Sequence, residues 1–290
     1  MPPAGGNEER KTSMERIQAA IQKAKEHRSS VGTAGAPQVR QAKPLARDRS
    51  SAPRVPGPIW PELKPFDPDP AVMRANRIVS YDRSDPAHAT FDMMRTKALR
   101  MMRENGWTSL GVTSPTAACG KTTVSLNLAF SLAHQPDTRT VLMDIDLRRP
   151  AVAHHIGMTE PQSMASVLQG TRELTENFVR YGETLAIGTS TRGVRSASEI
   201  LQHSSTGRML TAVKAQFRPD VIIYDLPPML VNDDVMAFLP HVDCVLLVAA
   251  AERSRLDEID KCEQDLAEQT NVLGVILNKC RYPGEEYGYY

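Results

Sequence analysis

A loop between a short apolar run and a helical pattern sets the strongest limit on the fold of this chain. The loop SPTAACGKTT (Ser114–Thr123) follows the run Ser109–Thr113 and leads into a helix-like stretch. Backbone N–H groups at such a helix start bind phosphate oxygens, and the helix dipole adds positive potential. Lys121 would reach the β- and γ-phosphates of a nucleotide, and the Thr122 hydroxyl would join a Mg²⁺ shell. The loop predicts a phosphate site, although Pro115 stands where a strict motif has glycine.

Short apolar runs alternate with helix-like stretches from about Pro86 onward. The runs are Ser109–Thr113, Val141–Met143, Val221–Tyr224, Asp243–Ala249 and Val272–Leu277. The helix-like stretches are Phe91–Glu104, Lys121–His134, Thr206–Phe217, Asp233–Phe238 and Ser254–Gln269. Runs of this kind are typical of strands buried on both faces. The alternation predicts an α/β fold with a mainly parallel sheet and helices on both faces.

Three aspartates follow two of these predicted strands. Asp144 and Asp146 lie in VLMDIDLRRP, and Asp225 lies in VIIYDLPP. The carboxyl ends of strands form the edge where open α/β sheets bind ligands, and a carboxylate there can hold Mg²⁺ directly or through water. A single strand-ending aspartate is about as often a turn residue. The phosphate loop and the two aspartate motifs, in this order on three strands, favour a nucleotide and metal site.

The two ends of the chain differ from the middle. Residues 1–85 hold about half of the 21 prolines and almost no β-branched apolar runs, which predicts a largely disordered tail. A short amphipathic helix is expected near residues 13–28, either as a solvated helix or as a docking helix for a partner or membrane surface. We expect the domain itself to span residues 86–280.

Residues 281–290 form a tyrosine-rich C-terminal tail. Four of the seven tyrosines lie in its sequence RYPGEEYGYY: Tyr282, Tyr287, Tyr289 and Tyr290. No apolar pattern around them would bury the rings. An ATP site and this tail in one chain suggest phosphoryl transfer to tyrosine.

Composition narrows the function classes. The net charge of +1 gives no support for bulk nucleic-acid binding. No stretch reaches the ~18 apolar residues that span a bilayer, and the start lacks the apolar core of a signal peptide, so a cytoplasmic protein is expected. The four cysteines form no CxxC pair, which argues against iron–sulfur relatives of the phosphate-loop proteins.

From about Phe91 to Tyr290 the chain resembles the bacterial tyrosine kinases (BY-kinases) of capsule and exopolysaccharide biosynthesis, the CpsD/CapB type. The segments that carry the resemblance occur in family order: TSPT with GKTT, DIDLRRP, SEIL at Ser198–Leu201, DLPPML, GVILNK and the tyrosine-rich end. The family's fold is a P-loop NTPase fold, and its three nucleotide motifs are called Walker A, A′ and B. The resemblance implies ATP and Mg²⁺ as cofactors and tyrosines near the C-terminus as acceptors.

The resemblance also implies roles for individual residues. Asp144 would act as the base toward the tyrosine hydroxyl or hold water around the metal, Asp146 would support the metal shell, and Asp225 would be the Walker B carboxylate. The catalytic residues expected are Lys121, Asp144 and Asp146. The nucleotide-binding residues expected are Thr116, Ala117, Ala118, Cys119, Gly120, Lys121, Thr122, Thr123 and Asn278. The metal ligands expected are Thr122, Asp144, Asp146 and Asp225, and the acceptors are Tyr282, Tyr287, Tyr289 and Tyr290.

As a kinase of this type, the chain would regulate exopolysaccharide or capsule synthesis and export. It is similar to members that work beside a separate membrane polysaccharide copolymerase, which would recruit it to the inner face of the plasma membrane. Two segments depart from the family pattern. Ala117-Ala118-Cys119 replaces a Pro-Gly-Glu or Pro-Gly-Cys sequence, and an Ala118 at positive φ would cost about 1 kcal/mol. Ala89–Thr96 keeps only Arg95 of the three charged residues in the family's oligomerisation helix, so ring assembly is in question and other self-association stays open.

Other functions compete with the kinase. A catalytically weak nucleotide-binding scaffold of the export machinery fits the altered loop. A ParA/MinD-like ATPase shares the three carboxylate positions, but it would carry a signature lysine where this chain has Thr116 and would lack the tyrosine cluster. A GTPase is disfavoured because Asn278-Lys279-Cys280-Arg281 lacks the aspartate of an NKxD motif.

Overall fold

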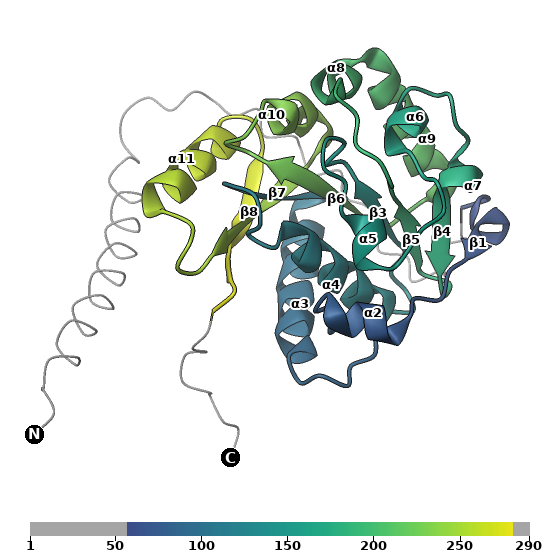
Figure 1. Ribbon diagram of the computed structural model, residues 1–290, viewed down its shortest axis with the longest axis horizontal. Helices are drawn as coiled ribbons and strands as arrows, with labels where there is room; N and C mark the ends of the chain where they lie inside the picture. The colour runs from purple at the N-terminus through teal and green to yellow at the C-terminus, as the bar shows by residue number, and fades with distance from the viewer. Residues whose placement is uncertain (1–56, 281–290) are drawn as a thin grey trace, which may run out of the picture. The chain divides into compact units, whose positions relative to one another are not determined.

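The computed structural model describes residues 57–280 and has an eight-stranded sheet at its centre (Figure 1). The strand order is β1-β4-β5-β3-β6-β2-β7-β8. Every neighbouring pair is parallel except β4 and β5, which are antiparallel. The strands are β1 (Lys64–Pro65), β2 (Ser109–Ser114), β3 (Thr140–Asp144), β4 (Phe178–Tyr181), β5 (Leu185–Gly188), β6 (Val221–Pro228), β7 (Cys244–Ala250) and β8 (Asn271–Asn278).

Helices pack on both faces of this sheet (Figure 1). One face is covered by α2 (Pro70–Ala75), α3 (His88–Asn105), α4 (Lys121–Ala133) and α5 (Val152–His155). The other is covered by α6 (Met164–Leu168), α7 (Leu174–Asn177), α8 (Ala197–Gln202), α9 (Ser204–Phe217), α10 (Asp234–Phe238) and α11 (Leu256–Ala267), with the 3₁₀ turns η1 (Trp60–Glu62) and η2 (Leu239–His241). The predicted α/β architecture, with a mainly parallel sheet between two helical layers, is confirmed.

The central strands are apolar on both sides because each side chain meets one of the two helical layers. In β3, Val141 and Met143 join the core under α6, α8 and α9, while Leu142 between them joins the core under α4. The four central strands β2, β3, β6 and β7 are buried along their whole length. Two-sided burial explains why these strands read as continuous apolar runs in the sequence.

The ordered domain begins well before Pro86, so the boundary predicted there lies too late in the chain. Gly57 is already packed, because a Cβ on it would lie 1.9 Å from the Gln216 carbonyl oxygen. Trp60 is buried and its indole Nε1 donates a hydrogen bond to the Phe217 carbonyl at 2.8 Å. Residues 57–80 also place Leu63, Met73 and Ile78 in the two cores. These anchors are scattered along a proline-rich stretch, so they show no period of two or 3.6 that marks an element.

Two other predictions fall on parts of the chain outside this description. The helix expected near residues 13–28 and the tyrosine-rich tail at residues 281–290 both lie outside residues 57–280. Within the described range, no helix has both the length and the apolar character needed to cross a membrane.

Candidate nucleotide site

The predicted phosphate loop borders a hollow of about 380 Å³ at the carboxyl edge of the sheet. Its walls include Ala117, Ala118, Gly120, Lys121, Thr122 and Thr123 from the loop and Asp146 from the segment after β3. Asp144 and Asp225 lie at the same edge, fully buried, as neighbouring Cα partners on β3 and β6. The structure therefore brings the three predicted motifs together where open α/β sheets bind ligands.

The backbone of the loop adopts left-handed conformations at two positions. Gly120, immediately before α4, has φ of 93°, and Ala118 has φ of 61°. A Cβ on Gly120 would lie 2.2 Å from Asn278 Nδ2, so glycine is required there. Ala118 therefore has the positive φ considered in the sequence analysis, a conformation in which a Cβ is unfavourable.

Cys119 and Asn278, both predicted to bind nucleotide, support the loop in this structure. The Asn278 amide donates from Nδ2 to the Cys119 carbonyl at 3.0 Å. The Cys119 thiol is buried between the hydroxyls of Thr116 and Ser254, at 3.7 and 3.5 Å. Neither residue lines the hollow, and the nucleotide-binding role expected for these two residues stays a prediction.

Lys121 lies among carboxylates. Its Nζ is 3.0 Å from Asp146 Oδ2 and 3.7 Å from Asp225 Oδ2. Burial lowers the pKa of Lys121, but the nearby Asp225 and Asp146 outweigh it and the net direction is upward. The ammonium group therefore keeps its proton and balances part of the negative charge at this edge of the sheet.

Asp225 is held by two hydroxyls of α4. Thr122 Oγ1 donates to Asp225 Oδ2 at 2.7 Å, and Ser125 Oγ donates to Oδ1 at 3.0 Å. Thr122 thus has the position expected of a residue that shares a metal shell with the Walker B carboxylate. Ser125 was not predicted from the sequence, although its place one turn after Thr122 on the same helix could have suggested it.

Asp144 has one oxygen engaged and one free. Oδ2 accepts hydrogen bonds from the backbone N–H groups of Ala151 and Val152, both at 3.1 Å, and so holds the start of α5. Oδ1 is buried and has no hydrogen-bond partner among the described residues. Burial and the neighbouring Asp225 raise the pKa of Asp144 well above its ordinary range. A buried carboxyl with a raised pKa and an unused oxygen is suited to accept a proton.

The residues fit a magnesium nucleotide better than a metal held by protein alone. Within the described part of the chain, no group of three acidic, histidine or cysteine side chains forms a site that could by itself hold a metal ion. Mg²⁺ usually takes only one or two carboxylates and completes its shell with water and substrate phosphates. The hydroxyl of Thr122, the unused Asp144 oxygen and the Lys121 ammonium beside the loop are groups of the kind that such a nucleotide requires.

The chain is similar in sequence and in fold to known nucleotide-binding proteins. The model of the CobQ/CobB/MinD/ParA nucleotide binding domain matches residues 110–287. The chain belongs to this family. Its matches also include a "Tyrosine-protein kinase CpsD" of Streptococcus agalactiae, 28% identical over 203 residues that make up 69% of this chain and 86% of that protein. Among solved structures, the VpsO kinase domain is 30% identical with a TM-score of 0.60, and the match covers 69% of this chain and 99% of that one.

A third relative is much longer than this chain. The "Putative tyrosine-protein kinase EpsB" of Ralstonia nicotianae is 27% identical over 208 residues, which are 71% of this chain and 27% of EpsB. The chain therefore spans about a quarter of the length of that protein. The resemblance to bacterial tyrosine kinases, predicted from the motifs, is confirmed.

Arg95, the surviving charged residue of the oligomerisation segment, is engaged within its own chain. Its NH1 group is 2.6 Å from Asp92 Oδ1 and donates to the carbonyl and hydroxyl oxygens of Ser131, both at 3.0 Å. Its side chain is only 11% exposed. The helix that would build a family ring here forms an internal cluster between α3 and α4.

Arg148 and Arg149 both border the hollow but differ in their contacts. Arg148 pairs with the buried Asp234 through Nε at 2.7 Å and NH2 at 3.0 Å, and its NH1 donates to the Arg195 carbonyl at 2.8 Å. It therefore ties the A′ segment to α8 and α10. Arg149 is exposed and lines the hollow. Asp234 was not predicted, because nothing local in the sequence pairs it with a residue 86 positions earlier.

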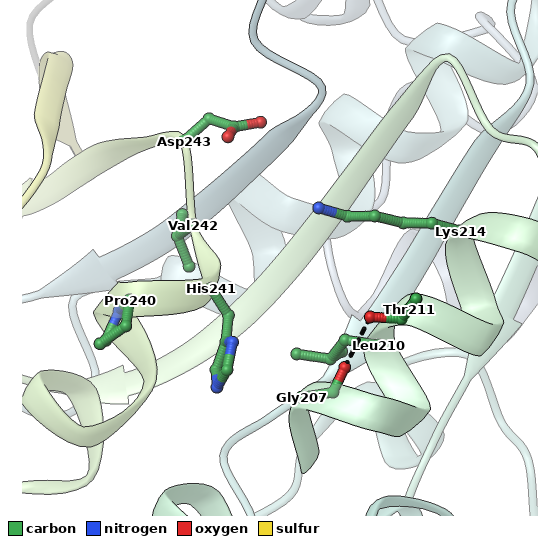
Figure 2. A pocket seen from close by; sticks show the side chains of 8 residues that line it. All are labelled: Gly207, Leu210, Thr211, Lys214, Pro240, His241, Val242 and Asp243. Atoms are coloured by element: carbon green, nitrogen blue, oxygen red, sulfur yellow. Dashed lines mark hydrogen bonds between the residues drawn. The ribbon is translucent and has the colours of Figure 1, made fainter. Parts of the chain in front are cut away.

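A second hollow of about 190 Å³ lies between α9 and the turn before β7 (Figure 2). Lys214 and His241 border it, and the Asp243 carboxylate beside them accepts the backbone N–H groups of Thr108 and Ser109, both at 2.8 Å. Asp243 immediately precedes β7, so this hollow lies at the amino end of that strand. It is at the wrong edge of the sheet for the nucleotide chemistry.

Proposed function

We propose that this chain is an Mg–ATP-dependent protein-tyrosine kinase that phosphorylates its own C-terminal tyrosines. The observation that carries the proposal is Asp144, with its buried, unpartnered oxygen and raised pKa, at the end of the strand beside Asp225 and in the same cluster as Lys121. A kinase needs a group that takes the proton of an incoming hydroxyl, and Asp144 Oδ1 is available for it. The tyrosine cluster of residues 281–290 supplies such hydroxyls, which favours the kinase over a nucleotide-hydrolysing ATPase with the same three carboxylates.

Magnesium ATP would supply the phosphoryl group and neutralise much of its charge. Lys121 would exchange its contacts with Asp146 and Asp225 for the β- and γ-phosphates, and the backbone N–H groups of the loop would bind the same phosphates. Thr122 and Asp225 would hold the metal, with Asp146 supporting the shell. Asp144 would orient the tyrosine hydroxyl and accept its proton late, because positioning and charge neutralisation dominate this kind of transfer.

The acceptors in this proposal are Tyr287, Tyr289 and Tyr290, with Tyr282 less favoured because it directly precedes Pro283. Gly284 and Gly288 give the segment backbone freedom to enter an active site. The biological setting would be capsule or exopolysaccharide synthesis, as the names of the relatives suggest. The partner would be a membrane polysaccharide copolymerase that recruits the kinase to the inner face of the plasma membrane.

One observation favours the second candidate, a nucleotide-binding scaffold with weak activity. Ala118 holds a left-handed conformation that glycine would adopt without strain. Lys121, Thr122, Asp144, Asp146 and Asp225 lie around one site, and this is the set of groups that phosphoryl transfer uses, which favours the kinase instead.

Calorimetric binding of Mg–ATP tests the site. Lys121→Met should abolish detectable binding, since it removes the ammonium group aimed at the phosphates. Lys121→Arg keeps the positive charge among the carboxylates, so it should fold like the wild type yet bind poorly, because a planar guanidinium does not fit the place of an ammonium. Lys97→Met, on the exposed side of α3, is the control. Unchanged affinity in Lys121→Met would refute the assignment.

A further inference from the structure

The end of β8 contacts the phosphate loop from outside the nucleotide hollow. Lys279 Nζ donates to the Ala118 carbonyl at 2.8 Å, and Asn278 Nδ2 donates to the Cys119 carbonyl at 3.0 Å. Ala118 and Gly120 line the hollow, whereas neither Asn278 nor Lys279 does. Two successive carbonyls of the loop are therefore bound by residues that do not line the hollow.

Fixing these carbonyls also fixes the N–H groups that would bind phosphate. In a planar trans peptide the C=O and N–H bonds point in opposite directions. The Ala118 carbonyl belongs to the same peptide as the Cys119 N–H, and the Cys119 carbonyl belongs to the same peptide as the Gly120 N–H. When β8 binds the two carbonyls, both N–H groups are turned away from β8.

Ala118 gives this contact a particular importance. Its φ of 61° is a conformation that an alanine avoids and that persists only where the surroundings impose it. Lys279, the residue that binds its carbonyl, also has a left-handed backbone, with φ of 60°. The cation that touches the strained peptide comes from the residue directly after β8, 161 positions away in the sequence.

We infer that Lys279 is a positioning residue that holds the Ala118–Cys119 peptide in its phosphate-binding orientation and so compensates for the absence of glycine at position 118. Lys279 does not touch the nucleotide in this role. Its effect should depend on which residue occupies position 118, because a glycine there would keep the left-handed conformation without help. The inference rests on the proposed nucleotide site.

A double-mutant cycle separates this role from a simple effect of charge. Affinity for Mg–ATP is measured for the wild type, Lys279→Met, Ala118→Gly and the double variant, with Lys97→Met as the control for loss of a surface lysine. Lys279→Met should weaken binding roughly three- to tenfold, the range for a charge-assisted hydrogen bond that is partly exposed. In the Ala118→Gly background the same change should weaken binding less than about twofold.

Backbone ¹⁵N relaxation without nucleotide provides a second readout, because an amide order parameter reports how firmly an N–H group is held in one orientation. Lys279→Met should lower the order parameters of Cys119 and Gly120, Ala118→Gly should restore them in the double variant, and Lys97→Met should change neither amide. An equal loss of affinity in both backgrounds would show that Lys279 acts only through its charge and would overturn the inference. Unchanged order parameters and affinity in Lys279→Met would overturn it as well. A wild-type protein that binds no Mg–ATP would refute the nucleotide site, and the relaxation experiment would still decide the role of Lys279.

Discussion

Asp144 should respond differently to alanine and to asparagine. Alanine removes the oxygen that accepts the backbone N–H groups of Ala151 and Val152. Each buried donor left without a partner costs about 1–3 kcal/mol, so Asp144→Ala should lose about 2–6 kcal/mol of unfolding free energy. In a domain of this size 1 kcal/mol corresponds to roughly 2–4 °C. The melting temperature without nucleotide should therefore fall by about 4–24 °C.

Asparagine keeps a carbonyl oxygen for the same two N–H groups and removes the buried acid. Because burial and Asp225 raise the pKa of Asp144, the folded protein holds this proton more tightly than the unfolded chain does. The wild type then loses stability as the pH rises from the ordinary aspartate range through the raised value, whereas Asp144→Asn does not. The variant should melt at or above the wild-type temperature, and its advantage should be larger at about pH 8 than at about pH 5.

Thermal unfolding of the three proteins at both pH values, followed by a kinase assay, checks this reasoning. Both variants should lose tyrosine phosphorylation by orders of magnitude, since neither has a carboxylate to accept the hydroxyl proton. If Asp144→Asn melts as low as Asp144→Ala, the account of Oδ2 as an anchor for α5 is wrong. If Asp144→Asn keeps its activity, Asp144 is not the base.

Three other predictions test separate parts of the description. Ala118→Gly should relieve about 1 kcal/mol of left-handed strain and raise the melting temperature by roughly 2–4 °C, and an unchanged or lower value would argue against strain at this position. Deleting residues 1–56 should leave the melting transition of the domain in place, whereas deleting residues 1–80 should abolish cooperative melting because it removes the buried Trp60, and equal stability of the two truncations would contradict the packing of residues 57–80. Changing three tail tyrosines to phenylalanine should spare ATP hydrolysis and remove almost all phosphotyrosine, and full phosphorylation of that variant would place the acceptors outside Tyr287, Tyr289 and Tyr290.

The sequence was sufficient to predict a strand or helix where the element is long and its apolar pattern is continuous. The five predicted strands are all present, and four of them are apolar runs buried between two helical layers. The prediction of burial on both faces is wrong for β8, which lies at the edge of the sheet and leaves Val275 and Leu277 exposed. The short antiparallel pair β4 and β5 was missed, since four residues each are too few to establish a period. Trp60 and its neighbours were assigned to a disordered tail, since composition over a long window conceals single buried residues.

In the nucleotide site, too, the residues that belong to local motifs were predicted, whereas contacts between distant segments were not. Lys121, Thr122, Asp144 and Asp225 were predictable because the ends of neighbouring parallel strands and the loop after β2 meet at one edge. The partners that hold them were not predictable. The contact of Lys279 with Ala118 and the pairing of Arg148 with Asp234 depend on chain segments far apart in the sequence.

Mass spectrometry of the protein isolated from its own host tests the central claim most directly. Wild type and Lys121→Arg would be compared with and without treatment by a tyrosine phosphatase. The kinase proposal predicts phosphate on the C-terminal tyrosines of the wild type, removed by the phosphatase and absent from Lys121→Arg. Unmodified tyrosines in the wild type, or equal phosphorylation in Lys121→Arg, would contradict it, because the tail would then be no substrate or would be modified by another enzyme.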